Sequence, residues 1–340
     1  MSLAIRHSGQ TRIPLKVSKG SAAPALPLMR RFPGLARVPR VSLGRFPTPV
    51  TAAPTLGSDF WVKRDDLSAD PIGGNKVRAL EFLLGGVREG DTVVTVGAVG
   101  STHALAVAIY AKRLGARVLV GRWQQEMNPQ ATRVADRLVR EADVAPVFRS
   151  PIGAYLWAWK QRAEGARWIP AGGRSPLGTL GHVNAALELA NQISAGELAS
   201  PNHVIVPLGT GGTAAGLTLG FAIAGVETTV VGARVVPRIV GRQRRVVSLV
   251  ASTARLIERL GGSPVPRPAP WRFVVAHESY GGAYGRETET GRTATGEFRA
   301  WSGMELDATY SAKACAVALS LEGGARLFWL TFDSRILGRQ

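Results

Sequence analysis

Two stretches of this chain each contain an apolar strand, a glycine-containing turn, a helix and a further strand, and this order constrains the fold strongly. Two strands of one sheet that are joined by a helix form a parallel pair with a right-handed crossover. The sequence therefore predicts an α/β protein with open parallel sheets. The expected strand, helix and strand lie at residues 92–96, 104–114 and 117–120 in the first stretch, and at residues 203–208, 214–224 and 228–236 in the second.

The composition is that of a globular protein. Hydrophobic residues make up 45% of the 340 residues and charged residues 19%, which allows a large core in one or two domains. No apolar run reaches 18 residues, so we expect no membrane span, and we expect no secretory leader. The single cysteine, Cys315, excludes an internal disulfide and indicates a reducing compartment, so we expect a cytoplasmic protein.

The net charge of +18 is concentrated in two segments. Residues 1–58 contain nine Lys or Arg and no acid, and residues 238–245 contain four arginines. Few aromatic residues accompany them, so nucleic-acid bases would have little to stack on, and we expect a solvated surface and no nucleic-acid partner. Because prolines in residues 1–31 argue against an amphipathic helix, we predict a basic, flexible extension there. An organelle transit peptide is the less favoured alternative.

The turn before one predicted helix places a lysine in an unusual position. Gly73, Gly74 and Asn75 precede Lys76, and an apolar helical pattern follows it. The positive end of a helix dipole favours a neutral amine and attracts anions. An amine that can attack an aldehyde beside an anion-binding backbone suggests a Schiff base with pyridoxal 5'-phosphate. A solvated lysine on a helix is the alternative that this motif alone leaves open.

The loop after the strand at 203–208 is suited to a phosphate. Its glycines leave backbone N–H groups free to converge on an anion at the start of a helix, and its threonines add hydroxyl donors. It matches neither a dinucleotide fingerprint nor a Walker loop, so a small phosphorylated cofactor fits better than NAD or ATP. A tight turn without a ligand is the alternative. The loop consists of Gly209, Thr210, Gly211, Gly212 and Thr213.

Two further segments carry candidate substrate-binding groups. Ser101, Thr102 and His103 follow a strand and begin a helix, where parallel sheets bind ligands, and their hydroxyl and N–H groups suit a carboxylate. Tyr284 lies in a glycine-rich loop, and Tyr310 follows 26 residues later. A phenol can relay protons if nearby cations lower its pKa. An ordinary helix start and packing tyrosines are the alternatives.

In their order along the chain, these motifs resemble the 1-aminocyclopropane-1-carboxylate deaminase and D-cysteine desulfhydrase family, which belongs to the fold type II (tryptophan-synthase-β-like) pyridoxal phosphate enzymes. The similarity extends from about residue 32 to about residue 331. It is carried by seven segments, which are Pro47-Thr48-Pro49, Val62-Lys63-Arg64-Asp65-Asp66-Leu67, Gly73-Gly74-Asn75-Lys76, Gly100-Ser101-Thr102-His103, Pro170-Ala171-Gly172-Gly173, Gly209-Thr210-Gly211-Gly212-Thr213 and Leu306-Asp307-Ala308-Thr309-Tyr310-Ser311-Ala312-Lys313-Ala314.

The resemblance implies two open parallel-sheet domains with the cofactor between them. The larger domain would comprise residues 32–72 and 190–340, the smaller one residues 73–189, and two copies would form a homodimer. The resemblance implies no metal. The implied catalytic residues are Lys76 (Schiff base and proton transfer), Ser101, Tyr284 and Tyr310. A small amino-acid substrate would contact Ser101, Thr102, His103 and Tyr284. The cofactor would be held by Asn75, Lys76, Thr102, Gly209, Thr210, Gly211, Gly212, Thr213, Ser311 and Thr331.

The residue near the pyridine nitrogen of the cofactor differs within the family. Deaminases carry Glu there and desulfhydrases Thr, whereas this chain has Ser311. Because a hydroxyl does not hold a proton on that nitrogen as a carboxylate does, the cofactor becomes a milder electron sink, which suffices for α-proton loss and β-elimination. We therefore predict a D-cysteine desulfhydrase-like lyase that forms pyruvate, ammonia and sulfide. The alternatives are 1-aminocyclopropane-1-carboxylate deamination, racemisation or other amino-acid chemistry, and a non-catalytic binding protein.

Two single positions and one residue pair depart from the family pattern. Thr102 stands where Asn is usual, and Ala79 stands where a lysine is often near the phosphate. Phe332 and Asp333 replace a common glycine pair. We expect this last change to crowd the cofactor side and to affect the choice of substrate.

Overall fold

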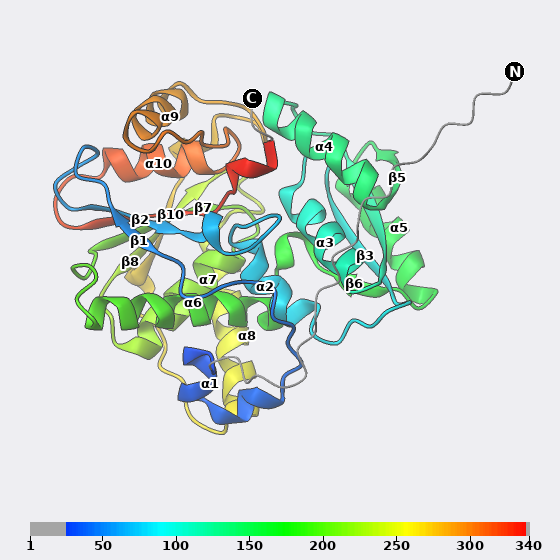
Figure 1. The fold of residues 1–340 in the computed structure, drawn as a ribbon, viewed down its shortest axis with the longest axis horizontal. Helices are drawn as coiled ribbons and strands as arrows, with labels where there is room; N and C mark the ends of the chain where they lie inside the picture. Colours follow the sequence, from blue (N-terminus) through cyan, green and yellow to red (C-terminus); the bar gives the residue numbers. More distant parts are fainter. Residues whose placement is uncertain (1–24, 338–340) are drawn as a thin grey trace, which may run out of the picture.

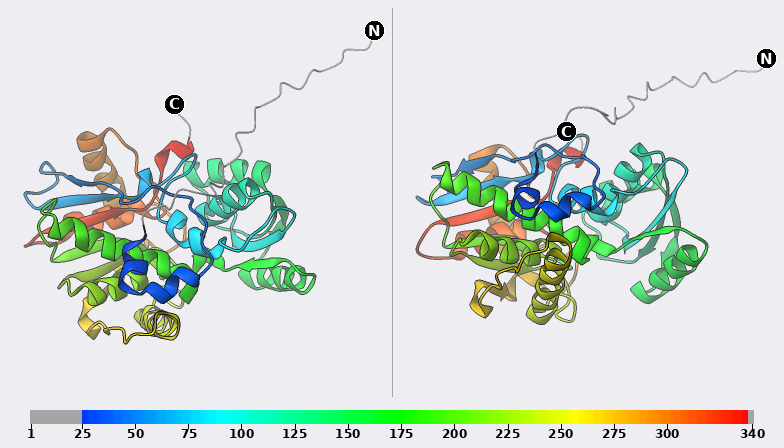
Figure 2. Two further views of the ribbon diagram at one scale, coloured as in Figure 1. Left: turned by 60° about the horizontal axis from the view of Figure 1, so that its bottom comes forward. Right: turned by 90° about the horizontal axis from the view of Figure 1, so that it is seen from below.

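The computed structural model describes residues 25–337, which form two sheets that lie side by side with helices on their faces (Figures 1 and 2). The first sheet has the strand order β1-β2-β10-β7-β8-β9 and is parallel except for its edge strand β1. The second sheet is parallel, with the order β5-β4-β3-β6. The strands are β1 (Val50–Ala52), β2 (Phe60–Arg64), β3 (Thr92–Ala98), β4 (Arg117–Trp123), β5 (Asp143–Phe148), β6 (Arg167–Ile169), β7 (His203–Leu208), β8 (Thr229–Arg234), β9 (Phe273–Ala276) and β10 (Arg326–Leu330).

The predicted α/β class with parallel sheets is confirmed. The α-helices are α1 (Pro27–Arg31), α2 (Lys76–Leu83), α3 (Thr102–Arg113), α4 (Pro129–Glu141), α5 (Pro151–Ala163), α6 (Pro176–Ser194), α7 (Gly212–Ala224), α8 (Gln243–Gly261), α9 (Glu289–Ser302) and α10 (Ser311–Ser320). Short 3-10 helices are η1 (Pro33–Arg37), η2 (Asp65–Leu67), η3 (Ala171–Gly173), η4 (Pro270–Arg272), η5 (Glu278–Tyr280) and η6 (Ser334–Leu337). None of the helices in this described part is long and apolar enough to cross a bilayer.

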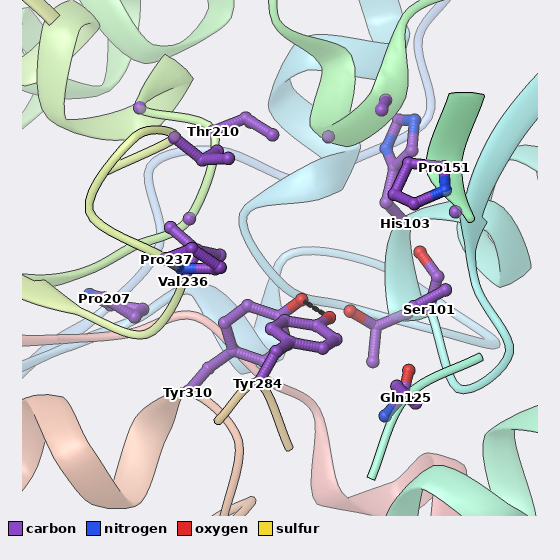
Figure 3. Close-up of a pocket in the computed structure, with 18 of the residues that line it drawn as sticks. Ser101, His103, Gln125, Pro151, Pro207, Thr210, Val236, Pro237, Tyr284 and Tyr310 are labelled. Atoms are coloured by element: carbon purple, nitrogen blue, oxygen red, sulfur yellow. Dashed lines mark hydrogen bonds between the residues drawn. The ribbon is translucent and has the colours of Figure 1, made fainter. Parts of the chain in front are cut away.

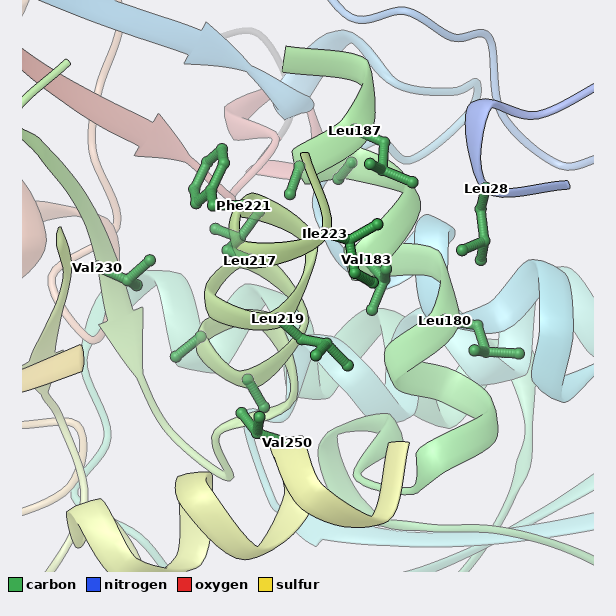
Figure 4. Packing of buried hydrophobic residues seen from close by; sticks show 14 of the residues in the cluster. Leu28, Leu180, Val183, Leu187, Leu217, Leu219, Phe221, Ile223, Val230 and Val250 are labelled. Carbon is green, nitrogen blue, oxygen red and sulfur yellow. The ribbon is translucent and has the colours of Figure 1, made fainter. Parts of the chain in front are cut away.

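Helices α6 and α7 form the apolar layer beneath the first sheet (Figure 4). Their backbones approach closely, because a Cβ on Gly216 of α7 would lie 2.3 Å from the Cβ of His182 on α6. The stiff α6–α7 pair therefore supports the residues at the N-terminus of α7. It also places His182, which the sequence analysis did not single out, close to the candidate site.

Two segment boundaries expected from the sequence do not coincide with the way the segments pack in the structure. Residues 25–31 were assigned to the flexible extension, but Leu28 is fully buried and its N–H donates to Asn184 Oδ1 at 3.1 Å. Residues 1–24 of that extension lie outside the described residues. The boundary at residue 189 falls within α6, whose apolar side chains belong to the core of the first sheet. Hydrophobic burial thus joins α1 and α6 to the six-stranded layer, which the local sequence pattern did not reveal.

Candidate active site

A cavity of about 530 Å³ lies where strands of the two sheets end. Its wall includes Ala98 and Trp123 at the carboxyl ends of β3 and β4, and Val236 and Thr331, which follow β8 and β10. The carboxyl edge of parallel sheets is where such folds bind ligands. Every site residue predicted from the sequence lines this cavity except Ser311.

The turn that presents Lys76 is held by the segment after β10. The N–H of Gly73 donates to Asp333 Oδ2 at 2.7 Å, and the N–H of Asn75 donates to the carbonyl of Thr331 at 3.2 Å. Gly74 has φ +103°, and a Cβ there would lie 2.6 Å from that same carbonyl, so only glycine fits. Of the pair expected to crowd the cofactor side, Phe332 lines the cavity, whereas Asp333 anchors the turn before Lys76.

Lys76 is the first residue of α2 and reaches the cavity. Burial lowers the pKa of its ammonium to about 8, and Asp307 partly opposes this shift. The sequence argument attributed a neutral amine to the helix dipole, whereas burial is the larger cause in the structure. A substantial fraction of neutral amine near neutral pH suits attack on an aldehyde.

Arg78, on the same helix as Lys76, belongs to a buried ionic network. Arg78 pairs with Asp65 at 2.7 Å and with Glu188 at 2.9 Å, and Lys63 pairs with Glu188 at 2.7 Å. Burial alone would raise the pKa of Glu188, but Arg78 and Lys63 lower it to about 2. The network fixes α2 to β2 and α6, and therefore fixes where Lys76 emerges.

The glycine loop after β7 presents open backbone to the cavity. Gly211 has φ +92°, and no atom lies within 4 Å of where a Cβ on Gly212 would be. No side chain in the described part of the chain caps the N-terminus of α7, so the first N–H groups of this helix are available to an anion. The hydroxyl of Thr213 accepts a hydrogen bond from Asn75 Nδ2 at 2.7 Å, which ties this loop to the lysine turn.

The segment after β3 also faces the cavity. Ser101 caps α3 by accepting the N–H of Ala104 at 3.2 Å, which leaves its own proton free to be donated. Both ring nitrogens of His103 are buried, and the ring lies next to the backbone of Pro170. Burial, and secondarily Lys76, lower the pKa of His103 to about 3, so the ring is neutral and has an N–H to donate. Thr102 lies between them in the lining.

Tyr284 and Tyr310 meet at the opposite part of the wall through their hydroxyls (Figure 3). Their rings are 5.9 Å apart and tilted by 77°. Burial raises the pKa of Tyr284 to about 12 and raises that of Tyr310 well above its usual value. Nearby cations therefore do not lower these pKa values, so the condition that the sequence analysis set for a proton relay is not met, and both phenols remain protonated donors at neutral pH.

Asn128, which the sequence analysis missed, connects the second sheet to both tyrosine segments. Its Oδ1 caps α4 by accepting the N–H of Ala131 at 2.8 Å. Its Nδ2 donates to the carbonyl of Gly285 at 2.9 Å and to Thr309 Oγ1 at 3.1 Å. Because Gly285 and Thr309 are the neighbours of Tyr284 and Tyr310, one buried amide holds both tyrosine segments against α4.

Ser311 lies behind the cavity wall at the start of α10. Its side chain is fully buried, and its hydroxyl interacts with the carboxylate of Asp307, which partly opposes the rise that burial causes in the pKa of that group. Its N–H donates to Asp307 Oδ2 at 2.9 Å, next to the bond from Tyr310 N–H to Oδ1 at 2.7 Å.

Residues 41–328 match the family described as pyridoxal-phosphate dependent enzyme. The chain belongs to this family. A Pyrococcus abyssi protein provisionally named 1-aminocyclopropane-1-carboxylate deaminase is 36% identical over 82% of this chain and 86% of its own. A D-cysteine desulfhydrase of Klebsiella pneumoniae subsp. pneumoniae is 30% identical over 83% and 88%. The nocardicin C-9' epimerase of Nocardia uniformis subsp. tsuyamanensis is 34% identical over 89% and 95%.

A solved structure of an ACC deaminase homologue superposes with a TM-score of 0.73 at 28% identity, covering 89% of this chain and 94% of the other. These findings confirm the family that the sequence motifs resemble, the fold type II architecture and pyridoxal phosphate as the cofactor of the enzyme. The cavity fits this group chemically, because it combines an amine at Lys76 with an uncapped helix N-terminus and the open backbone of Gly212.

Proposed function

We propose that this enzyme catalyses α,β-elimination from a small amino acid, with D-cysteine as the model substrate and pyruvate, ammonia and hydrogen sulfide as products. The observation that carries this proposal is the buried hydroxyl of Ser311 at the start of α10, where the family resemblance places the residue near the cofactor's ring nitrogen. Glu126 is the one carboxylate found in the described cavity lining, and it is paired with Arg286 at 3.0 Å. Behind the lining, the two carboxylate oxygens of Asp307 accept the N–H groups of Tyr310 and Ser311. We therefore infer that the Ser311 hydroxyl, rather than a carboxylate, meets the cofactor's ring nitrogen.

When bound, pyridoxal phosphate withdraws electrons from the α-carbon of the attached amino acid, and a ring without a firmly held proton does so moderately. The glycine loop and Asn75 would hold the phosphate and ring. The neutral amine of Lys76 would take the α-proton. Ser101 and neutral His103 would donate hydrogen bonds to the substrate carboxylate.

The tyrosine pair would supply a proton to the leaving group. Tyr284 and Tyr310 share one hydrogen bond through their hydroxyls, so one of their two protons remains free for donation. A departing thiolate at the β-carbon needs such a donor. Water then completes the reaction, in which D-cysteine and one water give pyruvate, ammonia and hydrogen sulfide.

Ring opening of 1-aminocyclopropane-1-carboxylate is the second candidate, because relatives carry that name. The experiment compares initial rates of sulfide and pyruvate release from D-cysteine with 2-oxobutyrate release from the cyclopropane substrate, with Lys76→Ala as the control. We expect faster turnover of D-cysteine, and none by the variant. Faster release of 2-oxobutyrate would reject the desulfhydrase assignment.

We also propose that the enzyme acts in the cytoplasm as a homodimer, without a metal or a nucleic-acid partner. The cytoplasmic assignment rests on the single cysteine, Cys315, and the homodimer on the family resemblance. Light scattering of the purified enzyme tests the second point, since a mass near that of one chain would contradict it.

A further inference from the structure

The cavity offers little positive charge for the phosphate of the cofactor. Among the residues that the structure describes, Lys76 is the one lysine or arginine in the lining, and its amine is needed at the aldehyde. The N-terminus of α7 supplies about half a positive charge. A phosphate monoester carries about −1.5 to −2 charges at neutral pH. Further cations are therefore expected just outside the lining, at the glycine loop.

Two arginines flank the glycine loop. Arg174 follows η3, where a Cβ on Gly172 would come within 2.3 Å of the hydroxyl of the loop's first threonine. Arg174 Nη2 donates to the carbonyl of Arg245 at 3.0 Å. The next residue, Val246, packs on the loop, since a Cβ on Gly211 would lie 3.0 Å from its Cγ2. Arg174 and Arg245 thus lie within two residues of positions that contact the loop, on two different elements.

Neither guanidinium is matched by an acid. Within residues 25–337, neither Arg174 nor Arg245 forms an ion pair with a carboxylate, and Arg174 Nε is buried without a hydrogen-bond partner. Both lie within electrostatic range of Tyr155, which lines the cavity. Two neighbouring cations without a counter-charge, one with a buried unused donor, form an arrangement that suits an anion.

We propose that Arg174 and Arg245 bind the phosphate of pyridoxal phosphate together with the loop of residues 209–213. Arginine is suited to this because its planar guanidinium donates two parallel hydrogen bonds to phosphate oxygens. Part of the arginine-rich segment at 238–245 then has a binding role, in place of the solvated surface that the sequence suggested. The same chemistry would recognise a distal anion of a substrate, and the experiment separates the two sources.

The test measures cofactor affinity without turnover. Apoenzyme of the parent, Arg174→Gln and Arg245→Gln is titrated with pyridoxal phosphate and with pyridoxal, which lacks the phosphate, and absorbance of the bound cofactor gives each Kd. Arg244→Gln is the matched control, because Arg244 is the exposed neighbour of Arg245 on α8 and its substitution removes the same charge. The outcome does not depend on which amino-acid reaction the enzyme catalyses.

We expect Arg174→Gln and Arg245→Gln to bind pyridoxal phosphate about tenfold more weakly, the effect of losing one charge-assisted hydrogen bond, and to bind pyridoxal as the parent does. An unchanged ratio of the two affinities in both variants overturns the proposal. If Arg174→Gln misfolds and binds neither pyridoxal phosphate nor pyridoxal, the ratio of the two affinities in Arg245→Gln decides the question, because Arg245 is exposed. The variants could instead keep the parent's cofactor affinity and show a raised KM for S-(carboxymethyl)cysteine, which has a distal carboxylate, but not for S-propylcysteine, which lacks one. This result would assign the arginines to substrate binding and would also overturn the proposal.

Discussion

Replacing Asn128 by alanine and by serine separates its two tasks, the cap of α4 and the support of the tyrosine segments. Alanine removes the cap, worth about 1 kcal/mol, and two buried hydrogen bonds, each worth about 1 kcal/mol. The free energy of unfolding should fall by about 3 kcal/mol. At about 2 °C per kcal/mol for a chain of this size, Tm should fall by about 6 °C.

Serine restores the cap, because it is an accepted residue at that position, but it is too short to reach Gly285 and Thr309. Asn128→Ser should therefore recover about 1 kcal/mol of stability. Turnover should stay about ten- to a hundredfold below the parent in both variants, because both release the segments that position Tyr284 and Tyr310. Thermal unfolding and steady-state kinetics measure the two effects. If serine restores both stability and kcat, Asn128 is only a helix cap and the reasoning fails.

Three further perturbations test the buried groups. Glu188→Ala leaves two buried cations without their shared carboxylate and should lower the free energy of unfolding by about 3–5 kcal/mol, measured with denaturant; a loss below 1 kcal/mol would contradict the network. The rate at which apoenzyme binds pyridoxal phosphate should increase as pH rises through about 8 and then level off, because the lowered pKa of Lys76 supplies neutral amine above that pH. Stopped-flow absorbance measures this rate. A rate that still increases steeply from pH 9 to 10 would indicate a lysine with an unshifted pKa. Tyr284→Phe should lower kcat about tenfold or more with little change in KM, and a change confined to KM would place the phenol in binding alone.

The sequence was sufficient to predict those elements whose structure depends on the local pattern of apolar and turn residues. The strand His203–Leu208 agrees residue for residue with the expectation, because it is a short apolar run bounded by turn residues. The motifs at Lys76 and at 209–213 lie together at the cavity because strand ends of parallel sheets share one edge. Motif order along the chain was thus enough to locate the site.

Long-range partners were not predictable. Its local sequence indicates only that Asn128 is an ordinary helix cap. Nothing near it in the sequence indicates its hydrogen bond to Gly285, 157 residues away. Arg78 meets Glu188 across 110 residues. Helix α5 was missed because its sequence does not show a one-sided apolar face, and Ile152 and Trp159 are in fact exposed. Burial, which raises the tyrosine pKa values, is also a property of the fold and is invisible in a local window.

Strand β10 is the last strand of the chain to be synthesised, yet it lies between β2 and β7 in the middle of the first sheet. The residues that follow it, Thr331 and Asp333, hold the turn before Lys76. A growing chain on the ribosome therefore cannot form the lysine site until β10 and the residues after it have emerged, even though its earlier helices and strands can form sooner. Cofactor capture must wait for this segment, and a chain terminated before β10 lacks the support that its lysine turn requires.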